Sequence, residues 1–393
     1  MKRFLLTVAI SVALLFPKSG RIDYSVLALI LIVVPIVGFK LFTFSKNREV
    51  QVIYFGLFLQ GVVGLMSLIY NNQVSDNIAL RPFRTGLLIW LFHGLLTHRD
   101  DLGIKFVFDT IIYSAIINGA IIIIQYWLHN SGIKDDFMLM PGFDTSENVA
   151  YRKAGLASGY PTAGLLELMG LISTYLRGKN ESSWANWLIT VILVAALSLT
   201  SRMALYLGGI IGLIVILESY WLGKHLKAIT ILVMCAGLVP VGFLMSKLGV
   251  IHENTISVML ELFINLLEGR FETESSNSLM ASYGFNIFSP GTLLIGNGLS
   301  NQDDALRTLD DGFQINFFGG GLLYFVIVYI IFCVMFRRIN FAMCLIGTRY
   351  WALVISSLYL LAEVKGACIF SRFAFDHMLL LYVVALKSRL RRC

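Results

Sequence analysis

The chain has 393 residues, of which 57% are hydrophobic and 14% are charged. This composition excludes a soluble globular protein and indicates a polytopic membrane protein. Its formal net charge of +7 would suit a soluble nucleic-acid-binding protein, but in a membrane protein Lys and Arg set the orientation, so we expect no nucleic-acid partner.

About twelve apolar runs each approach the roughly 20 residues that a helix needs to cross a bilayer. In chain order they cover 4–16, 22–42, 50–70, 78–96, 104–129, 161–176, 184–200, 202–220, 226–246, 312–336, 340–362 and 373–389. The first run also fits a cleaved signal peptide, but no A-x-A-like site follows it, which favours a retained helix. We therefore expect an all-α polytopic membrane protein, with residues 1–393 forming a single integral membrane domain.

The basic residues predict the orientation of this domain. Short cytoplasmic connectors collect Lys and Arg, and alternate connectors are basic, including those with Lys46, Arg177 and the pair Arg337 and Arg338. Both termini are then expected in the cytoplasm. Two long connectors, 130–160 and 247–311, fall on the outer side, where loops of this length are usually functional or disordered.

The second long connector contains the stretch ISVMLELFINLLEG, which predicts an amphipathic helix. Its polar stripe includes Glu261 and Glu268, and its other faces are apolar. Two roles stay open for this helix: it roofs the membrane bundle, or it guides a substrate.

Several arginines fall on the outer side, against the positive-inside pattern. A guanidinium offers a rigid bidentate fork that suits phosphate. Any single one of these arginines can instead pair with a nearby carboxylate or reach lipid phosphates, but several at one level favour a shared anionic ligand such as a lipid diphosphate. The arginines are Arg81, Arg84, Arg152, Arg202, Arg270 and Arg372.

Other sites receive little support from the sequence. The stretch LIGNGLSNQDDALRTLDDGFQINFFGGGLLYF is rich in glycine, but no helix follows its G-N-G at the spacing of a nucleotide-binding fingerprint. The five cysteines lack C-x-x-C spacing, and no histidines lie at metal-ligand distance, so neither a disulfide framework nor a zinc site is expected. We expect no cofactor.

The order of motifs resembles one family of membrane enzymes. The chain reads RKAGLASGYPTAG, then LTSRMALYLGG, a long outer loop with an arginine, LIGNG, and DDGFQINFFGGGLLYF. This order resembles the Wzy-type O-antigen polymerases, which share a superfamily with the O-antigen ligases. The resemblance implies a GT-C-like protein of the bacterial inner membrane that acts at the periplasmic face on glycans linked to undecaprenyl diphosphate, without a nucleotide sugar or a metal.

The resemblance also assigns roles to residues. Arg152 and Arg202 match the family's motif arginines, and Arg270 looks like the arginine of the large loop, whereas the other outer arginines come from topology alone. Ligases carry a His-Asn pair before the glycine-rich start of the span after the large loop, where this chain reads LDDGFQ, with Asp311 in the histidine's place. This departure favours a polymerase over a ligase.

The expected reaction transfers a growing glycan from its lipid diphosphate to a sugar hydroxyl of an incoming lipid-linked repeat unit. Arginines near a low-dielectric boundary stabilise the leaving diphosphate, and we assign catalysis to Asp311, Arg270 and Arg202, with all six outer arginines binding diphosphate. Asp311 serves as a base, orients the hydroxyl, or only caps the following helix. The expected partners are the lipid-linked oligosaccharide, membrane lipid and, optionally, a chain-length regulator.

Alternatives to this reading remain. A ligase would transfer the glycan to the lipid A-core, and a flippase for lipid-linked oligosaccharides would also bind the diphosphate but should line several spans with charge. A scaffolding subunit of an export complex would need neither the arginines nor Asp311. A metal held by acidic residues would replace the arginines in neutralising the diphosphate; the candidate ligands are Asp303, Asp304, Asp310 and Asp311.

Overall fold

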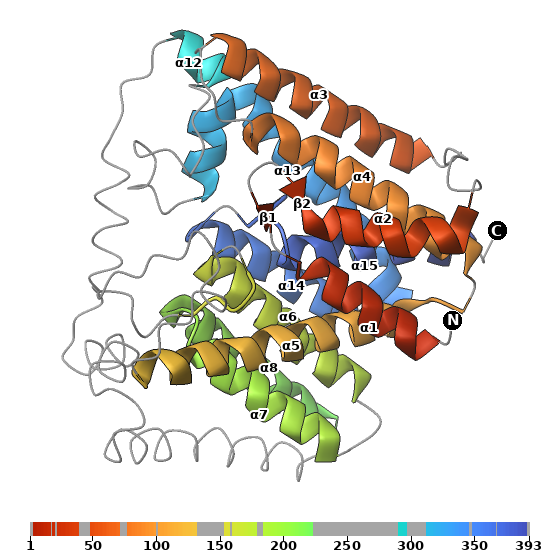
Figure 1. Cartoon of the computed structure of the whole chain (residues 1–393), viewed down its shortest axis with the longest axis vertical. Helices are drawn as coiled ribbons and strands as arrows, with labels where there is room; N and C mark the ends of the chain where they lie inside the picture. The colour runs from red at the N-terminus through yellow and green to blue at the C-terminus, as the bar shows by residue number, and fades with distance from the viewer. Residues whose placement is uncertain are drawn as a thin grey trace.

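The computed structural model is built almost wholly from helices (Figure 1). It describes residues 3–16, 18–19, 22–38, 48–70, 77–99, 101–131, 153–157, 159–178, 184–222, 290–296, 312–345, 348–366 and 368–390. The helices are α1 (Arg3–Leu14), α2 (Tyr24–Val37), α3 (Arg48–Tyr70), α4 (Asn77–His98), α5 (Ile104–Asn130), α6 (Tyr160–Arg177), α7 (Trp184–Ser198), α8 (Arg202–Trp221), α12 (Pro290–Ile295), α13 (Gly312–Leu345), α14 (Arg349–Glu363) and α15 (Ala374–Leu390). Between α1 and α2, the two-residue strands β1 (Lys18–Ser19) and β2 (Ile22–Asp23) pair antiparallel.

Four of these helices are long and apolar enough to cross a membrane: Arg48–Tyr70, Ile104–Leu128, Met203–Trp221 and Gly312–Cys344. Shorter apolar helices accompany them. The helical class expected from the sequence is therefore confirmed for the described residues, and the long apolar helices are compatible with a membrane protein. A helix occupies each predicted run except the ninth, 226–246, which lies outside the described residues, and the number of spans stays a prediction.

The boundary between the tenth and eleventh predicted runs was wrong. The sequence predicts a connector at Arg337 and Arg338, but α13 continues as helix to Leu345. Arg338 is only 7% exposed, lies 3.6 Å from the carboxylate of Glu49 and packs over the ring of Phe341. Because the neighbouring helices accommodate this cation, a charged residue does not end the helix here.

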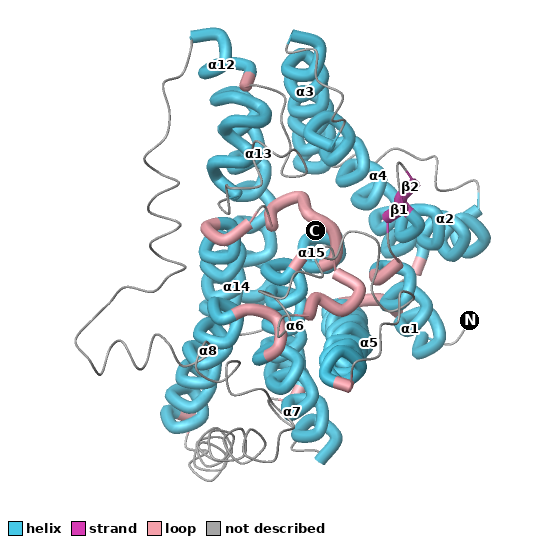
Figure 2. The backbone as a smooth tube through the Cα atoms, turned by 60° about the vertical axis from the view of Figure 1, so that its left-hand side comes forward, coloured by secondary structure: helices cyan, strands magenta, loops and turns pink. Residues whose placement is uncertain are grey.

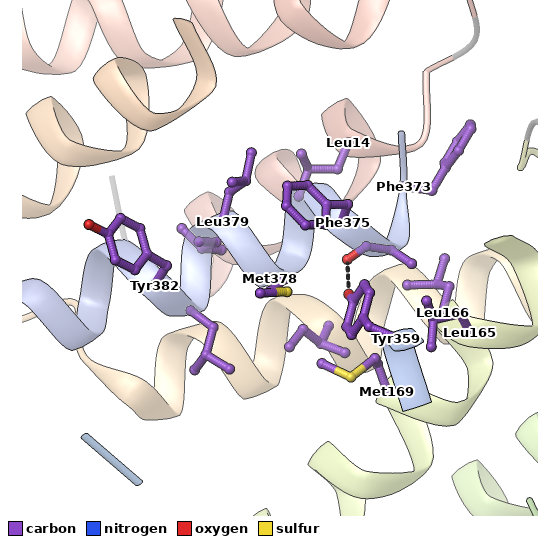
Figure 3. Packing of buried hydrophobic residues seen from close by; sticks show 14 of the residues in the cluster. Leu14, Leu165, Leu166, Met169, Tyr359, Phe373, Phe375, Met378, Leu379 and Tyr382 are labelled. Atoms are coloured by element: carbon purple, nitrogen blue, oxygen red, sulfur yellow. Dashed lines mark hydrogen bonds between the residues drawn. The ribbon is translucent and has the colours of Figure 1, made fainter. Parts of the chain in front are cut away.

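The helices lie side by side, with α3 and α4 at one end of the assembly and α7 and α8 at the other (Figure 2). Helix α15 runs between these groups and contacts α4, α5, α6 and α13. Residues 374–386 of this helix are all buried, and its middle stretch MLLLYVVAL is apolar on every side, which is the pattern of a helix surrounded by its neighbours. Figure 3 shows Phe375 and Met378 of α15 packed in this core, where the hydroxyl of Tyr359 donates to the carbonyl oxygen of Ala374 at 2.6 Å.

Ion pairs join the helix ends that the sequence places on the cytoplasmic side. Arg3 at the start of α1 and Arg177 at the end of α6 both pair with Asp109 of α5. The Lys387 ammonium of α15 donates to the carbonyl oxygens of Leu96 and Arg99. These ends meet on one side of the assembly, as alternating spans require, whereas the assignment of that side to the cytoplasm stays a prediction.

Two glycine motifs that lie apart in the sequence meet at a break in α13. Gly321 interrupts the helix with φ 77° and ψ 179°, and Gly296, just after α12, has φ 79°. A Cβ on Gly321 would lie 2.3 Å from the Leu294 carbonyl oxygen, and one on Gly296 would lie 2.5 Å from the Gly321 nitrogen. The LIGNG and FFGGG motifs therefore contain glycine because two backbones touch here and both need a left-handed conformation.

Candidate functional site

The first feature of the predicted outer side is a group of buried ion pairs, which we name the outer ion cluster: Asp23, Arg84, Arg372 and Asp376. Arg84 donates from Nε to Asp23 at 2.6 Å and from its two terminal nitrogens to both oxygens of Asp376, at 2.8 and 2.6 Å. Arg372 donates to Asp23 at 3.1 Å and also to the Phe16 carbonyl oxygen. Each of the four side chains is at most 15% exposed, so two cations and two anions balance inside the protein.

Helix starts provide the two carboxylates. Asp23 is the N-cap of α2, where it accepts a hydrogen bond from the Ser25 backbone nitrogen at 3.0 Å. Asp376 lies in the first turn of α15, where it accepts one from the Phe373 nitrogen at 3.1 Å. Acidic residues are favoured at both positions. Burial by itself raises the pKa of Asp23, but the guanidiniums of Arg84 and Arg372 outweigh it, so the pKa is lowered and the carboxylate stays ionised at neutral pH.

The cluster brings together helix ends that the predicted topology places on the outer side: the end of α1 and the starts of α2, α4 and α15. Arg84 and Arg372 have their guanidiniums engaged by carboxylates of the protein itself, which matches the ion-pair alternative for these two residues. Arg81, half-buried on α4, lies within electrostatic range of Tyr324 and Glu363. Diphosphate binding by these three arginines stays a prediction.

A buried carboxylate that the sequence analysis missed lies close by. Glu363, at the end of α14, is fully buried and accepts hydrogen bonds from Asn316 at 2.8 Å and Tyr329 at 3.1 Å. Its second oxygen accepts from the backbone nitrogens of Cys368 and Ile369, at 2.7 and 2.8 Å. Glu363 therefore connects the start of α13 to the segment that leads into Arg372. In the sequence, the feature that points to Glu363 is a single acidic residue at the end of an apolar run.

That segment holds an uncommon backbone. Phe370 and Phe373 have φ of 58° and 66°, a left-handed conformation that is unfavourable for bulky residues. The carboxylates of Glu363 and Asp376 hold this conformation in place, because they accept hydrogen bonds from the backbone nitrogens of Cys368 and Phe373 at the two ends of the segment. Such locally strained segments cluster at functional sites, which is consistent with a site near Arg372.

Aromatic side chains line the first part of α13. The ring of Phe313 stacks on that of Tyr329, with centroids 5.2 Å apart and planes at 23°, and Phe325 contacts both rings and Phe317. The rings are half-buried. Phe313 thus packs against protein aromatics, which is the ordinary role that a residue of this type has in a helix bundle.

The second feature of the predicted outer side is a contact between two of the sequence motifs. The Lys153 backbone nitrogen donates to the Leu199 carbonyl oxygen at 2.8 Å. Lys153 directly follows Arg152 in the chain, and Leu199 stands three residues before Arg202, the first residue of α8. The segment that follows Arg152 therefore lies against the turn that precedes α8, which is the contact that the predicted shared site needs.

Small residues let these segments approach. A Cβ on Gly164 of α6 would lie 2.5 Å from the Cβ of Ala204 and 3.2 Å from the Thr200 hydroxyl. Ser201 is the N-cap of α8, and its side chain accepts a hydrogen bond from the Ala204 nitrogen at 3.1 Å. The first turns of α6 and α8 are therefore held close together beside the segment 153–157.

Lys153 adds a basic group that the sequence analysis did not assign to the site. The residue as a whole is 8% exposed, and burial lowers the pKa of its ammonium to about 8. Near neutral pH the group is cationic, next in sequence to Arg152. In the sequence, the feature that points to Lys153 is the pair of adjacent basic residues in RKAGLAS.

Several predicted residues lie outside the described residues: Arg152, Arg270 and Asp311, with most of the connectors 130–160 and 247–311, including the predicted amphipathic helix and the acidic residues considered for a metal. The backbone of Arg202 is described and its side chain is not. Their roles stay predictions. Among the described residues, no group of three or more His, Cys, Asp or Glu side chains is arranged to hold a metal ion.

Comparisons with protein-family models, with curated proteins and with solved structures find no match to this chain.

Proposed function

We propose that the chain is a polymerase of lipid-linked surface polysaccharide, which transfers a growing glycan from undecaprenyl diphosphate to a sugar hydroxyl of an incoming lipid-linked repeat unit. The observation that supports it best is the hydrogen bond between Lys153 and Leu199. It joins the two segments whose arginines match the motifs of the Wzy-type O-antigen polymerases. No metal or cofactor is part of the proposal.

In this proposal Arg152, Arg202 and Arg270 bind the diphosphate. Breaking the bond between the sugar and the diphosphate leaves negative charge on the departing oxygen, and pre-positioned guanidiniums stabilise that charge best where water is excluded. Arginine suits this role because its fork contacts two phosphate oxygens at once. Arg84 and Arg372, each engaged with carboxylates of the outer ion cluster, then hold helix ends together around the site.

Asp311 directly precedes α13, which begins at Gly312. We assign it to the acceptor sugar, whose hydroxyl it orients or deprotonates as it attacks the anomeric carbon. Attack from the side opposite the leaving diphosphate inverts the configuration at that carbon. The competing role is a helix cap, in which Asn serves almost as well as Asp, so Asp311→Asn separates chemistry from capping.

The proposal places the protein in a bacterial inner membrane, with both termini in the cytoplasm and the site in the periplasm. Alkaline phosphatase, which is active only outside the cytoplasm, tests the orientation. Fusions at residues 145 and 285 should be active, and fusions at 180 and 225 should be inactive. Inactive fusions in both long connectors would reverse the topology and remove the outer arginines from a periplasmic site.

Purified protein supplied with a lipid-linked repeat unit tests the function. Arg202→Ala should abolish the product ladder, Arg202→Lys should restore only part of it because a point charge does not reproduce the fork, and Asp311→Asn should lose turnover while substrate still binds. Arg177→Ala, which removes a partner of Asp109 at the opposite helix ends, is the matched control and should keep the ladder. A normal ladder from both Arg202→Ala and Arg152→Ala would refute the shared diphosphate site.

Deletion of the gene distinguishes the related activities. Surface lipopolysaccharide from cells that lack a polymerase should carry a single repeat unit on its core. Core without any repeat would instead indicate a ligase, and an unchanged ladder would exclude both.

A further inference from the structure

An acidic residue lies fully buried inside the helix assembly, next to the segment 153–157. Glu167 of α6 is 0% exposed, and its Oε1 accepts a hydrogen bond from the Asn118 side-chain nitrogen of α5 at 3.0 Å. Its Oε2 has no hydrogen-bond partner among the described residues. An ionisable side chain inside a membrane domain is costly and usually has a role, and the proposed reaction does not use it directly.

The same Asn118 reaches the motif segment with its other atom. Its Oδ1 accepts a hydrogen bond from the Leu156 backbone nitrogen at 2.8 Å. Gln125, two turns further along α5, makes two hydrogen bonds with Gly155: its Oε1 accepts from the Gly155 nitrogen at 3.0 Å, and its Nε2 donates to the Gly155 oxygen at 3.1 Å. Two side chains on one face of α5 therefore hold the backbone of consecutive residues in the segment.

The fit leaves no room for larger residues. Gly155 has φ +63°, and a Cβ on it would lie 2.4 Å from Asn118 Oδ1. A Cβ on Gly119 would lie 3.2 Å from Glu167 Oε2. Glycine at both positions allows the segment and α6 to approach α5 closely enough for these hydrogen bonds.

We propose that Glu167, Asn118 and Gln125 form a positioning clamp, which fixes the segment 153–157, next in sequence to Arg152, against α5. The proposal rests on the proposed function for what Arg152 binds, but the clamp itself does not. These three are positioning residues, since they act through the segment and not on the substrate. The Lys153–Leu199 hydrogen bond completes the connection to the α7–α8 turn.

Glu167 contributes by orienting an amide. The side chain of Asn118 can turn over and exchange its oxygen and nitrogen, and only one orientation presents an acceptor to the Leu156 nitrogen. An acceptor at Glu167 selects that orientation because it engages the Asn118 nitrogen. Gln at position 167 offers the same acceptor, whereas Leu offers none, so Glu167→Gln should preserve the clamp and Glu167→Leu should release it.

Hydrogen exchange followed by mass spectrometry tests the clamp without any substrate. In Glu167→Leu, a peptide that covers 153–157 should exchange about tenfold faster, the effect of losing a hydrogen bond of ordinary strength, and it should exchange at the wild-type rate in Glu167→Gln. Gly155→Ala, which forces the segment away from Asn118, should give the same acceleration without changing either helix. The control is Glu218→Leu. The carboxylate of Glu218 accepts hydrogen bonds from Tyr175 and Trp351 and not from Asn118, so this variant should leave the exchange rate of the 153–157 peptide unchanged.

Binding of undecaprenyl diphosphate in detergent provides the second readout. Glu167→Leu and Gly155→Ala should weaken binding severalfold, and Glu167→Gln should restore it. Unchanged exchange in both Glu167→Leu and Gly155→Ala would overturn the clamp, and so would a Gln variant that fails to restore exchange. Faster exchange with unchanged diphosphate binding would show that the segment does not carry the diphosphate site, which is a failure of the proposed function and not of the hydrogen bonds.

Discussion

Replacing Gly321 with Ala tests the contact between the two glycine motifs. The new Cβ would lie 2.3 Å from the Leu294 carbonyl oxygen, whereas real Cβ atoms essentially never approach closer than 3.0 Å. The backbones must therefore separate by several tenths of an ångström. A residue with a Cβ at φ 77° and ψ 179° costs about 1–3 kcal/mol, and overpacking a tight contact costs about 1–3 kcal/mol more, so we expect a loss of about 2–6 kcal/mol in unfolding free energy.

The chain provides a matched control for this substitution. Gly212 lies inside α8, and a Cβ on it would meet no atom within 4 Å. Gly212→Ala should therefore be neutral or stabilising, because Ala favours a helix over Gly by about 1 kcal/mol.

Thermal unfolding in detergent can be followed with a thiol-reactive dye after the exposed free cysteines Cys333 and Cys344 have been blocked in the folded protein, since the free Cys368 is buried and becomes accessible on unfolding. Gly321→Ala should unfold at a clearly lower temperature than Gly212→Ala. Equal unfolding temperatures for the two variants would refute the backbone contact between Gly296 and Gly321.

Two further predictions concern charges on the predicted outer side. Asp376→Asn should lower the unfolding free energy by about 3 kcal/mol, the lower part of the range for breaking a buried ion pair, because Arg84 loses a bidentate partner. The control Asp101→Asn breaks the more exposed pair with Arg99 and should lower it by less than about 1 kcal/mol. Equal losses of thermal stability in the two variants would contradict the burial of the cluster. The second concerns pH: with a pKa of about 8, Lys153 is cationic below that pH and neutral above it, so affinity for undecaprenyl diphosphate should fall as pH rises from 7 to 9, and Lys153→Met should flatten this dependence. An identical pH dependence in Lys153→Met would remove Lys153 from the site.

The amino-acid sequence by itself determined the class of the protein and the position of most helices. Crossing a bilayer requires a continuous apolar run in which each backbone group bonds within its own helix, so the requirement is local and can be found in the sequence. The sequence also predicts that Arg152 and Arg202 share a site; the Lys153–Leu199 hydrogen bond joins the neighbouring segments, and the shared site itself stays a prediction.

Only the tertiary structure decided which polar residues meet. Arg84 pairs with Asp23 and with Asp376, which are 61 and 292 positions away, and no local pattern identifies such partners because ion pairs depend on which helix ends come together. The continuation of α13 past Arg338 has the same origin, since Glu49 on α3 accommodates that cation. The place of Glu167 behind the motif segment likewise depends on the packing of α5 against α6, which is set by side-chain fit across the whole core.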